Sequence, residues 1–248
     1  PFISKMTKSE LMALMTGGMA TVAGGVLAAY VGFGIDAAHL LAASVMSAPA
    51  ALVCAKMLVP ETEVSQTEGN LNVEIEIKTA NIVDAAAFGA SEGLKLAMNV
   101  GGMLLAFIAL IAMINGMLGW AGALVNIDNL SLELICSYLF APVAFIMGVP
   151  SQDIMVVGSL LGKKLIINEF VAYLDLKEAM ATLSPRSIAI STYALCGFAN
   201  FSSIAIQVGG IGVLAPDRRK DLALLGVKSL IGGTLACLMT ACVAGIFL

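Results

Sequence analysis

Glu169 is the ionisable residue whose sequence neighbours point most clearly to chemistry. It lies in the segment 165–173, with apolar side chains before and after it. An ionisable group at membrane depth is costly and indicates a functional site. Its carboxylate could accept hydrogen bonds from the hydroxyls of a ligand, bind a cation or carry a proton. The structural alternative is an ion pair with Lys163 or Lys164.

A second candidate site lies at residues 196–204, in the middle of a long uncharged stretch. The sequence there is Cys-Gly-Phe-Ala-Asn-Phe-Ser-Ser-Ile, in which Gly, Asn and Ser lower helix propensity. A helix that unwinds at this point would present Asn200 and Ser203 as hydrogen-bonding groups and Phe198 as an aromatic wall. Alternatively, these small and polar residues only pack one helix against another.

A third candidate is the glycine-rich segment 17–26, in which Thr21 carries the only side-chain oxygen. Glycines at this density can break a membrane helix and so expose backbone carbonyls. Close packing between helices explains the same small residues equally well.

These candidates are not accompanied by a catalytic constellation. The single histidine, His39, follows Asp36 by three residues at the start of an apolar stretch, and we expect it at a membrane interface. Since no acid–base–nucleophile set or phosphate-binding loop is present, we expect neither an enzyme nor a cofactor. The five cysteines stand singly in or beside apolar runs, without metal-ligand or disulfide spacing.

Composition places these residues in a membrane. Of the 248 residues, 59% are hydrophobic and 12% are charged. A soluble domain is typically about 45–50% apolar and about 25% charged, so this chain has too little polar surface to cover a water-soluble particle. The long apolar runs predict an all-α integral membrane protein. The net charge of −4 does not indicate the basic surface that nucleic-acid-binding proteins use.

Charge-free stretches mark five expected membrane crossings, because a helix needs roughly 20 apolar residues to span the hydrocarbon. They are residues 11–33, 38–57, 94–118, 187–213 and 226–248. The region 131–180 differs, because charged residues divide it into apolar pieces too short to span. Such pieces are typical of re-entrant hairpins or broken helices that line a cavity. The alternative is an amphipathic helix on the membrane surface.

Basic residues predict the orientation in the membrane. Arg218, Arg219 and Lys220 place the loop before the last helix in the cytoplasm, because cytoplasmic loops are enriched in Lys and Arg. The C-terminus is then outside, provided that 131–180 enters and leaves the membrane on one side. The loop 60–79, rich in glutamate, is predicted to be a solvated acidic connector. The chain begins without an initiator methionine, which predicts a piece of a longer protein.

Segments 168–173, 197–204 and 23–28 together resemble the concentrative nucleoside transporter family. Asn-Glu-Phe-Val-Ala followed by Gly-Phe-Ala-Asn is a specific combination, and the likeness runs over essentially the whole chain. Members carry a Gly-Gln-(Thr/Ser)-Glu element at the tip of a first hairpin. That element is absent here, and Pro1 is expected to begin just beyond it.

The resemblance implies a cation-coupled nucleoside symporter with re-entrant hairpins, broken helices and an inverted repeat. Sodium is the expected coupling ion, and the implied assembly is a homotrimer in the bacterial inner membrane that works by alternating access. The implied division is 1–93 for transport-domain helices, 94–130 for a scaffold helix at the trimer interface, and 131–248 for the second hairpin and the last two transport helices.

The resemblance also implies roles for single residues. Five positions match nucleoside-binding residues: Glu169, Asn200 and Ser203 toward the ribose, Phe198 along the pocket and Val26 toward the base. Thr21 and the carbonyl of Val22 match two ligands of a sodium site. Two alternatives stay open from the sequence: a proton-coupled nucleoside carrier, and a channel or accessory membrane subunit in which Glu169 is a pore-lining or structural charge.

Overall fold

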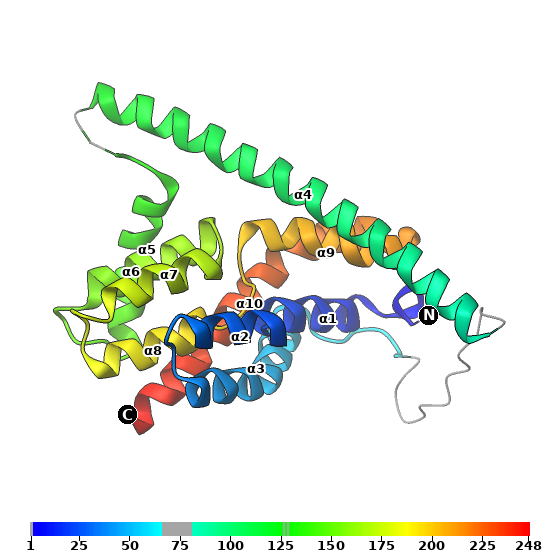
Figure 1. Ribbon diagram of the computed structural model, residues 1–248, viewed down its shortest axis with the longest axis horizontal. Helices are drawn as coiled ribbons and strands as arrows, with labels where there is room; N and C mark the ends of the chain where they lie inside the picture. Colours follow the sequence, from blue (N-terminus) through cyan, green and yellow to red (C-terminus); the bar gives the residue numbers. More distant parts are fainter. Residues whose placement is uncertain (1, 66–80, 126, 128) are drawn as a thin grey trace.

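The structure is a computed structural model that describes residues 2–65, 81–125, 127 and 129–248. At residues 92, 96–97, 99–101, 103–104 and 107 it describes the backbone alone. Over these ranges the chain forms helices and no β-strand, which confirms the expected all-α class. Figure 1 shows a bundle built around the last helix, with one long helix crossing its outer side.

In the described ranges the helices follow one another along the chain, with residues 59–81 between α3 and α4 and short connections between the others. They are α1 (Lys8–Ala20), α2 (Gly24–Gly32), α3 (Ala37–Leu58), α4 (Ile82–Leu124), α5 (Leu132–Ile146), α6 (Ile154–Ile166), α7 (Glu169–Ala179), α8 (Pro185–Leu195), α9 (Phe201–Leu214) and α10 (Arg219–Phe247). The described part of the chain also contains two short 3₁₀ turns, η1 (Ile3–Lys5) before α1 and η2 (Pro216–Arg218) before α10.

Among the residues that the structure describes, three segments are long and apolar enough to cross a membrane: Lys8–Gly32, Ala37–Leu58 and Pro216–Phe247. They correspond to the predicted crossings 11–33, 38–57 and 226–248, so the chain is a multi-pass membrane protein. The predicted crossing 94–118 lies within α4, which already begins at Ile82. The predicted boundary between residues 93 and 94 therefore falls inside one continuous helix.

Polar side chains at the N-caps decide where the helices begin. Thr7 and Glu10 form a reciprocal capping box at the start of α1, with 3.1 Å from the Glu10 N–H to Thr7 Oγ1 and 2.8 Å from the Thr7 N–H to Glu10 Oε2. Asp36 caps α3, and the backbone N–H groups of His39 and Ala38 hold the pKa of its carboxyl below the usual value. Asn168 and Asn200 cap α7 and α9 in the same way.

Two of the predicted crossings are broken helices. Residues 21–23 separate α1 from α2, and residues 196–200 separate α8 from α9. The predicted crossing 187–213 is therefore divided into α8 and α9, as the unwound-helix interpretation of 196–204 requires, because Asn200 starts a new helix after an extended segment. Both breaks are shorter than the segments predicted to unwind, since 17–20, 24–26 and 201–204 are helical.

The region 131–180 forms three helices, α5, α6 and α7, of 15, 13 and 11 residues. None reaches the roughly 20 residues that a crossing needs. α5 packs along α6, and α6 and α7 meet at residues 167–168, which form the tip of a hairpin. In Figure 1 the end of α4 and the start of α8 both lie at the left end of the molecule, α4 at the top and α8 below it.

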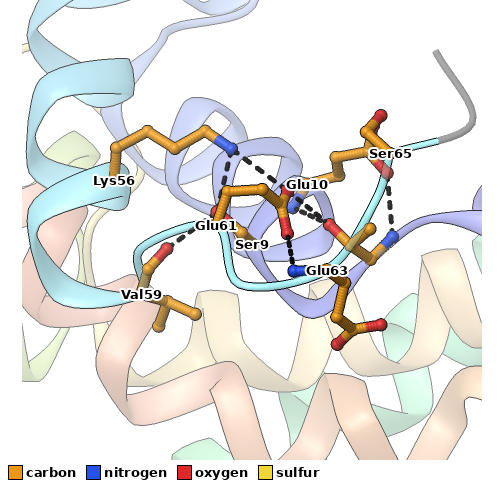
Figure 2. A network of polar contacts seen from close by, with 8 residues as sticks. Ser9, Glu10, Lys56, Val59, Glu61, Glu63 and Ser65 are labelled. Atoms are coloured by element: carbon orange, nitrogen blue, oxygen red, sulfur yellow. Dashed lines mark hydrogen bonds and ion pairs between the residues drawn. The ribbon is translucent and has the colours of Figure 1, made fainter. Parts of the chain in front are cut away.

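The opposite end of the molecule gathers the basic residues predicted to be cytoplasmic. The guanidinium of Arg218 donates to the carbonyls of Ile3, Ser4 and Met6. Figure 2 shows the neighbouring network, in which Lys56 Nζ lies 2.8 Å from Ser9 Oγ and 3.6 Å from Glu61 Oε2.

The acidic connector is described only as far as residue 65, and there it is tied to α1. The Thr7 hydroxyl donates to Glu61 at 2.7 Å, and this bond holds the pKa of Glu61 below its usual range. The Ser65 hydroxyl donates to Glu10 (Figure 2). The remainder of the predicted connector, residues 66–79, lies outside the described residues.

Candidate functional site

The tip of the α6–α7 hairpin meets the break between α8 and α9. Glu169 is the first residue of α7 and is 5% exposed, so its side chain points away from solvent. Asn200 Nδ2 donates to Glu169 Oε2 at 2.9 Å, across 31 positions of sequence. The hydroxyl of Tyr30, in α2, donates to the other carboxylate oxygen at 3.4 Å. Side chains from two other elements therefore hold this carboxylate.

The side-chain oxygen of Asn200 organises the start of α9. It accepts from the Ser202 hydroxyl at 2.7 Å, the Ser203 N–H at 2.8 Å and the Ser203 hydroxyl at 2.9 Å. Because its oxygen is filled, the Asn200 amide must point its nitrogen toward Glu169. The two hydroxyls have donated their protons, so each offers only lone pairs to a ligand.

A cavity of about 410 Å³ opens beside this cluster. The five residues that the sequence matched to nucleoside binding all line it: Glu169, Asn200, Ser203, Phe198 and Val26. The structure thus brings together residues from α2, α7, α9 and the break before α9. Volumes of roughly 300–1,000 Å³ are usual for small-molecule sites.

The cavity combines apolar walls with hydrogen-bond acceptors. Val26, Phe198 and Ile206 supply apolar surface, while the carboxylate of Glu169 and the hydroxyl oxygens of Ser202 and Ser203 accept. Such a site suits a ligand that carries several hydroxyl or N–H donors on a partly apolar frame. It disfavours an anion, since a second negative charge would face Glu169 across a poorly screened space.

Thr21 and Val22 lie in the break between α1 and α2, next to the break that carries Phe198. The Phe198 N–H donates to the Thr21 carbonyl at 3.4 Å. The Thr21 hydroxyl donates to the Gly17 carbonyl at 2.8 Å, so its lone pairs remain for a cation. In the described part of the chain, no backbone N–H donates to the carbonyl of Val22. These two oxygens do not line the cavity beside Glu169.

Two alternative interpretations of charged residues can be compared with the structure. Glu169 has no ion-pair partner within 4 Å among the residues described, and Lys163 instead pairs with Asp175. His39, at the start of α3, is half-buried, and its Nδ1 lies 3.2 Å from the hydroxyl of Tyr193 in α8. No group of three His, Cys, Asp or Glu residues able to hold a metal occurs in the ranges covered.

Sequence reasoning missed several residues that complete the site. Tyr30, Asn168, Ser202, Gln207 and Gly18 hold the carboxylate, cap a helix or line the cavity. Asn168 and Ser202 could have been found, because each adjoins a residue that was singled out. Gly18 lies inside the candidate segment 17–26, whereas Tyr30 and Gln207 give no such signal, because only the tertiary fold brings them to the site.

The family model described as Na+ dependent nucleoside transporter C-terminus matches residues 39–245. The chain belongs to this family. Uncharacterized transporter YutK of Bacillus subtilis (strain 168) is 49% identical over an alignment of 249 positions, which covers 100% of this chain and 62% of YutK. Sodium/nucleoside cotransporter 1 of Mus musculus is 45% identical over 262 residues, covering 99% of this chain and 40% of that protein.

Solved structures of the transporter CNTnw share the fold of this family member. The intermediate 3 state of a CNTnw variant superposes with a TM-score of 0.87 at 47% identity, covering 100% of this chain and 60% of CNTnw. The inward-facing substrate-bound state gives a TM-score of 0.79 at 48% identity, with coverages of 100% and 59%. The expected membrane-transporter class is confirmed, and the chain spans less than two thirds of these relatives' length.

Proposed function

We propose that this family member imports nucleosides across the bacterial inner membrane in symport with sodium, and is a transporter rather than an enzyme. Support for a nucleoside comes chiefly from the cavity, where Glu169, Ser202 and Ser203 present acceptors beside the apolar Val26 and Phe198. A ribose offers hydroxyl donors, and a base offers a flat apolar face. The names of the mammalian relatives, sodium/nucleoside cotransporter 1 among them, support the same substrate class.

We assign the hydroxyl-recognising role to Glu169, Asn200 and Ser203, with Phe198 along the wall and Val26 against the base. An acceptor cluster in a dry site discriminates strongly, because an analogue that lacks one hydroxyl leaves a buried polar group unpaired. Nucleotides should be excluded, because a phosphate would face the Glu169 carboxylate.

Sodium is proposed to bind at the break between α1 and α2, through the Thr21 hydroxyl and the Val22 carbonyl. Unwound backbone in broken membrane helices supplies the oxygen ligands that small cations need. A proton-coupled carrier is the second candidate, because the buried carboxylate of Glu169 could carry a proton itself.

The assembly is proposed to be a homotrimer in which α4 contributes to the interface. Several large apolar side chains of α4 are strongly exposed, among them Leu105, Met117 and Trp120. In a membrane protein such a face contacts lipid or a neighbouring subunit. Native mass spectrometry of the purified full-length protein would count the subunits, and a monomer would contradict this part.

The decisive experiment is uptake of labelled uridine and adenosine into proteoliposomes that contain the full-length protein. Sodium symport predicts accumulation against a concentration gradient, with a rate that rises with sodium at fixed pH. A proton-coupled carrier would follow the pH gradient and ignore sodium. A channel would equilibrate the nucleoside without accumulating it, and an accessory subunit would give no uptake on its own.

A further inference from the structure

Lys164 is a buried cation next to the proposed nucleoside site, yet it does not line the cavity. It lies in the last turn of α6 and is 3% exposed. A charge in such a place is costly unless other groups compensate it. The groups around Lys164 therefore indicate what compensates its charge.

One partner is the end of the first half of the broken helix. Lys164 Nζ donates to the carbonyl of Ala194 at 2.8 Å, one residue before α8 ends. The last carbonyls of a helix lack intrahelical donors and carry partial negative charge, so a cation is favoured there. The hydroxyl of Tyr173, from α7, donates to the Thr192 carbonyl at 2.7 Å. Both arms of the hairpin thus cap the same helix end.

The second group is Glu169, five positions further along the same hairpin. Within α6 and α7, Lys164 and Glu169 are the two charged side chains that are buried, and no contact within 4 Å joins them. The side chains that donate to the Glu169 carboxylate, Tyr30 and Asn200, are neutral. The adjacent Lys163 is partly exposed and is paired with Asp175.

We propose that Lys164 is a positioning residue that supplies the counter-charge for Glu169 and fixes the hairpin tip to the end of α8. This role rests on the proposed function, in which Glu169 receives the hydroxyls of a nucleoside. Because Lys164 and Glu169 are carried by one hairpin, their charges cancel within the part of the molecule that forms the site. The empty site then has no net charge from this pair, which lowers the cost of keeping it at membrane depth.

A double-mutant cycle in the purified full-length protein tests this role, with thermal unfolding and uridine affinity as readouts. Lys164→Met should lower Tm by several degrees and weaken uridine binding about tenfold. In the background of Glu169→Gln the same change should cost less than half of that Tm loss, since no carboxylate is then left without a counter-charge. Lys164→Arg, which keeps the charge, should retain uridine affinity within about threefold of the wild type.

Lys163→Met is the matched control. It should not change uridine affinity, and it should change Tm by the same amount in the wild type and in the Glu169→Gln background. If Lys164→Met lowers Tm equally in the wild type and in the Glu169→Gln background, Lys164 acts only as a helix cap. That result would overturn the proposal. A Lys164→Arg protein as impaired as Lys164→Met would also overturn it. If the wild type binds no nucleoside, the proposed function fails, whereas the Tm cycle still measures the charge coupling.

Discussion

Gly197 lies directly against the carbonyl of Ala20, so the extended segment between α8 and α9 contacts the end of α1. A Cβ atom at Gly197 would stand 2.6 Å from the Ala20 oxygen and 2.7 Å from Cys237 Sγ. The φ angle of Gly197 is +146°, which L side chains rarely adopt. The two helix breaks thus meet at a position that only glycine can fill.

Gly197→Ala should therefore destabilise the protein by about 2–4 kcal/mol, from backbone strain together with overpacking. Thermal unfolding of the purified full-length protein measures this loss. Gly17→Ala is the control, because it lies in α1 with no atom within 4 Å of an added Cβ. An unchanged Tm for Gly197→Ala would show that the two breaks do not touch.

Glu169→Gln should weaken nucleoside binding by about 1.5–3 kcal/mol, the scale of a hydrogen bond to a charged group. The amide keeps the size of the side chain but turns one acceptor into a donor, facing the Asn200 amide nitrogen. Isothermal titration of uridine and adenosine into the full-length protein measures the change.

Glu178→Gln tests whether any glutamate of α7 would have the same effect. Glu178 is exposed near the other end of that helix, away from the cavity beside Asn200. We expect unchanged affinity for this variant. Wild-type affinity in Glu169→Gln would return that residue to a structural role.

Thr21→Val should raise the sodium concentration for half-maximal uptake several-fold, because it preserves volume and removes one oxygen ligand. Nucleoside affinity should weaken at low sodium and recover at high sodium, since coupling between two ligands is reciprocal. Uptake into proteoliposomes, titrated with sodium at fixed pH, measures both effects.

Thr16→Val is the matched control in α1. In the part of the chain described, its buried hydroxyl has no hydrogen-bond partner, so we expect normal sodium dependence. A sodium response in Thr21→Val identical to that of the wild type would remove Thr21 from the cation site. A flat response in the wild type would reject sodium and leave the nucleoside assignment standing.

The sequence predicted where the helices are interrupted better than it predicted which residues meet there. Asn168 and Asn200 are helix caps, so local chemistry alone ends one helix and starts another where a polar group interrupts an apolar run. That is why the hairpin tip and the break after α8 could be found. Their meeting, with Glu169 2.9 Å from Asn200, followed only from the family resemblance.

The contacts made by the tertiary fold were out of reach. Tyr30 lies 139 positions before Glu169, and nothing in its neighbourhood distinguishes it from other aromatic residues in membrane helices. Charge-free length does not predict the start of α4 at Ile82, because Asp84 and Lys95 interrupt the apolar run without interrupting the helix. The sequence places Lys164 near Glu169, but it does not show that Lys164 donates to the Ala194 carbonyl.

Asp153, in the turn before α6, joins that turn to the start of α8. Its Oδ2 accepts from the hydroxyls of Ser187 and Ser184 at 2.6 and 2.7 Å, and from the Ser184 N–H at 3.1 Å. The Ser187 and Ser184 hydroxyls hold the pKa of this carboxyl below its usual value. Because Ser184 also caps α8, the carboxylate stabilises the helix that leads to the α8–α9 break.

Asp153→Asn should lower the stability at pH 7 by about 1–2 kcal/mol, since a neutral amide oxygen is a weaker acceptor for these donors. The pKa of Asp153 is lower in the folded protein than in the unfolded chain, where it is about 4. The stabilisation by this carboxylate is therefore complete above about pH 4, and it is lost as the pH falls through the pKa of the folded protein. The Tm difference between wild type and variant should therefore shrink on acidification below about pH 4.

Asp217→Asn is the control, because Asp217 is exposed and accepts one hydrogen bond, from Ser4. It should change Tm little at neutral or acidic pH. Thermal unfolding at a series of pH values measures all three proteins, and a Tm difference that stays constant into acid would show that Asp153 does not act through its charge.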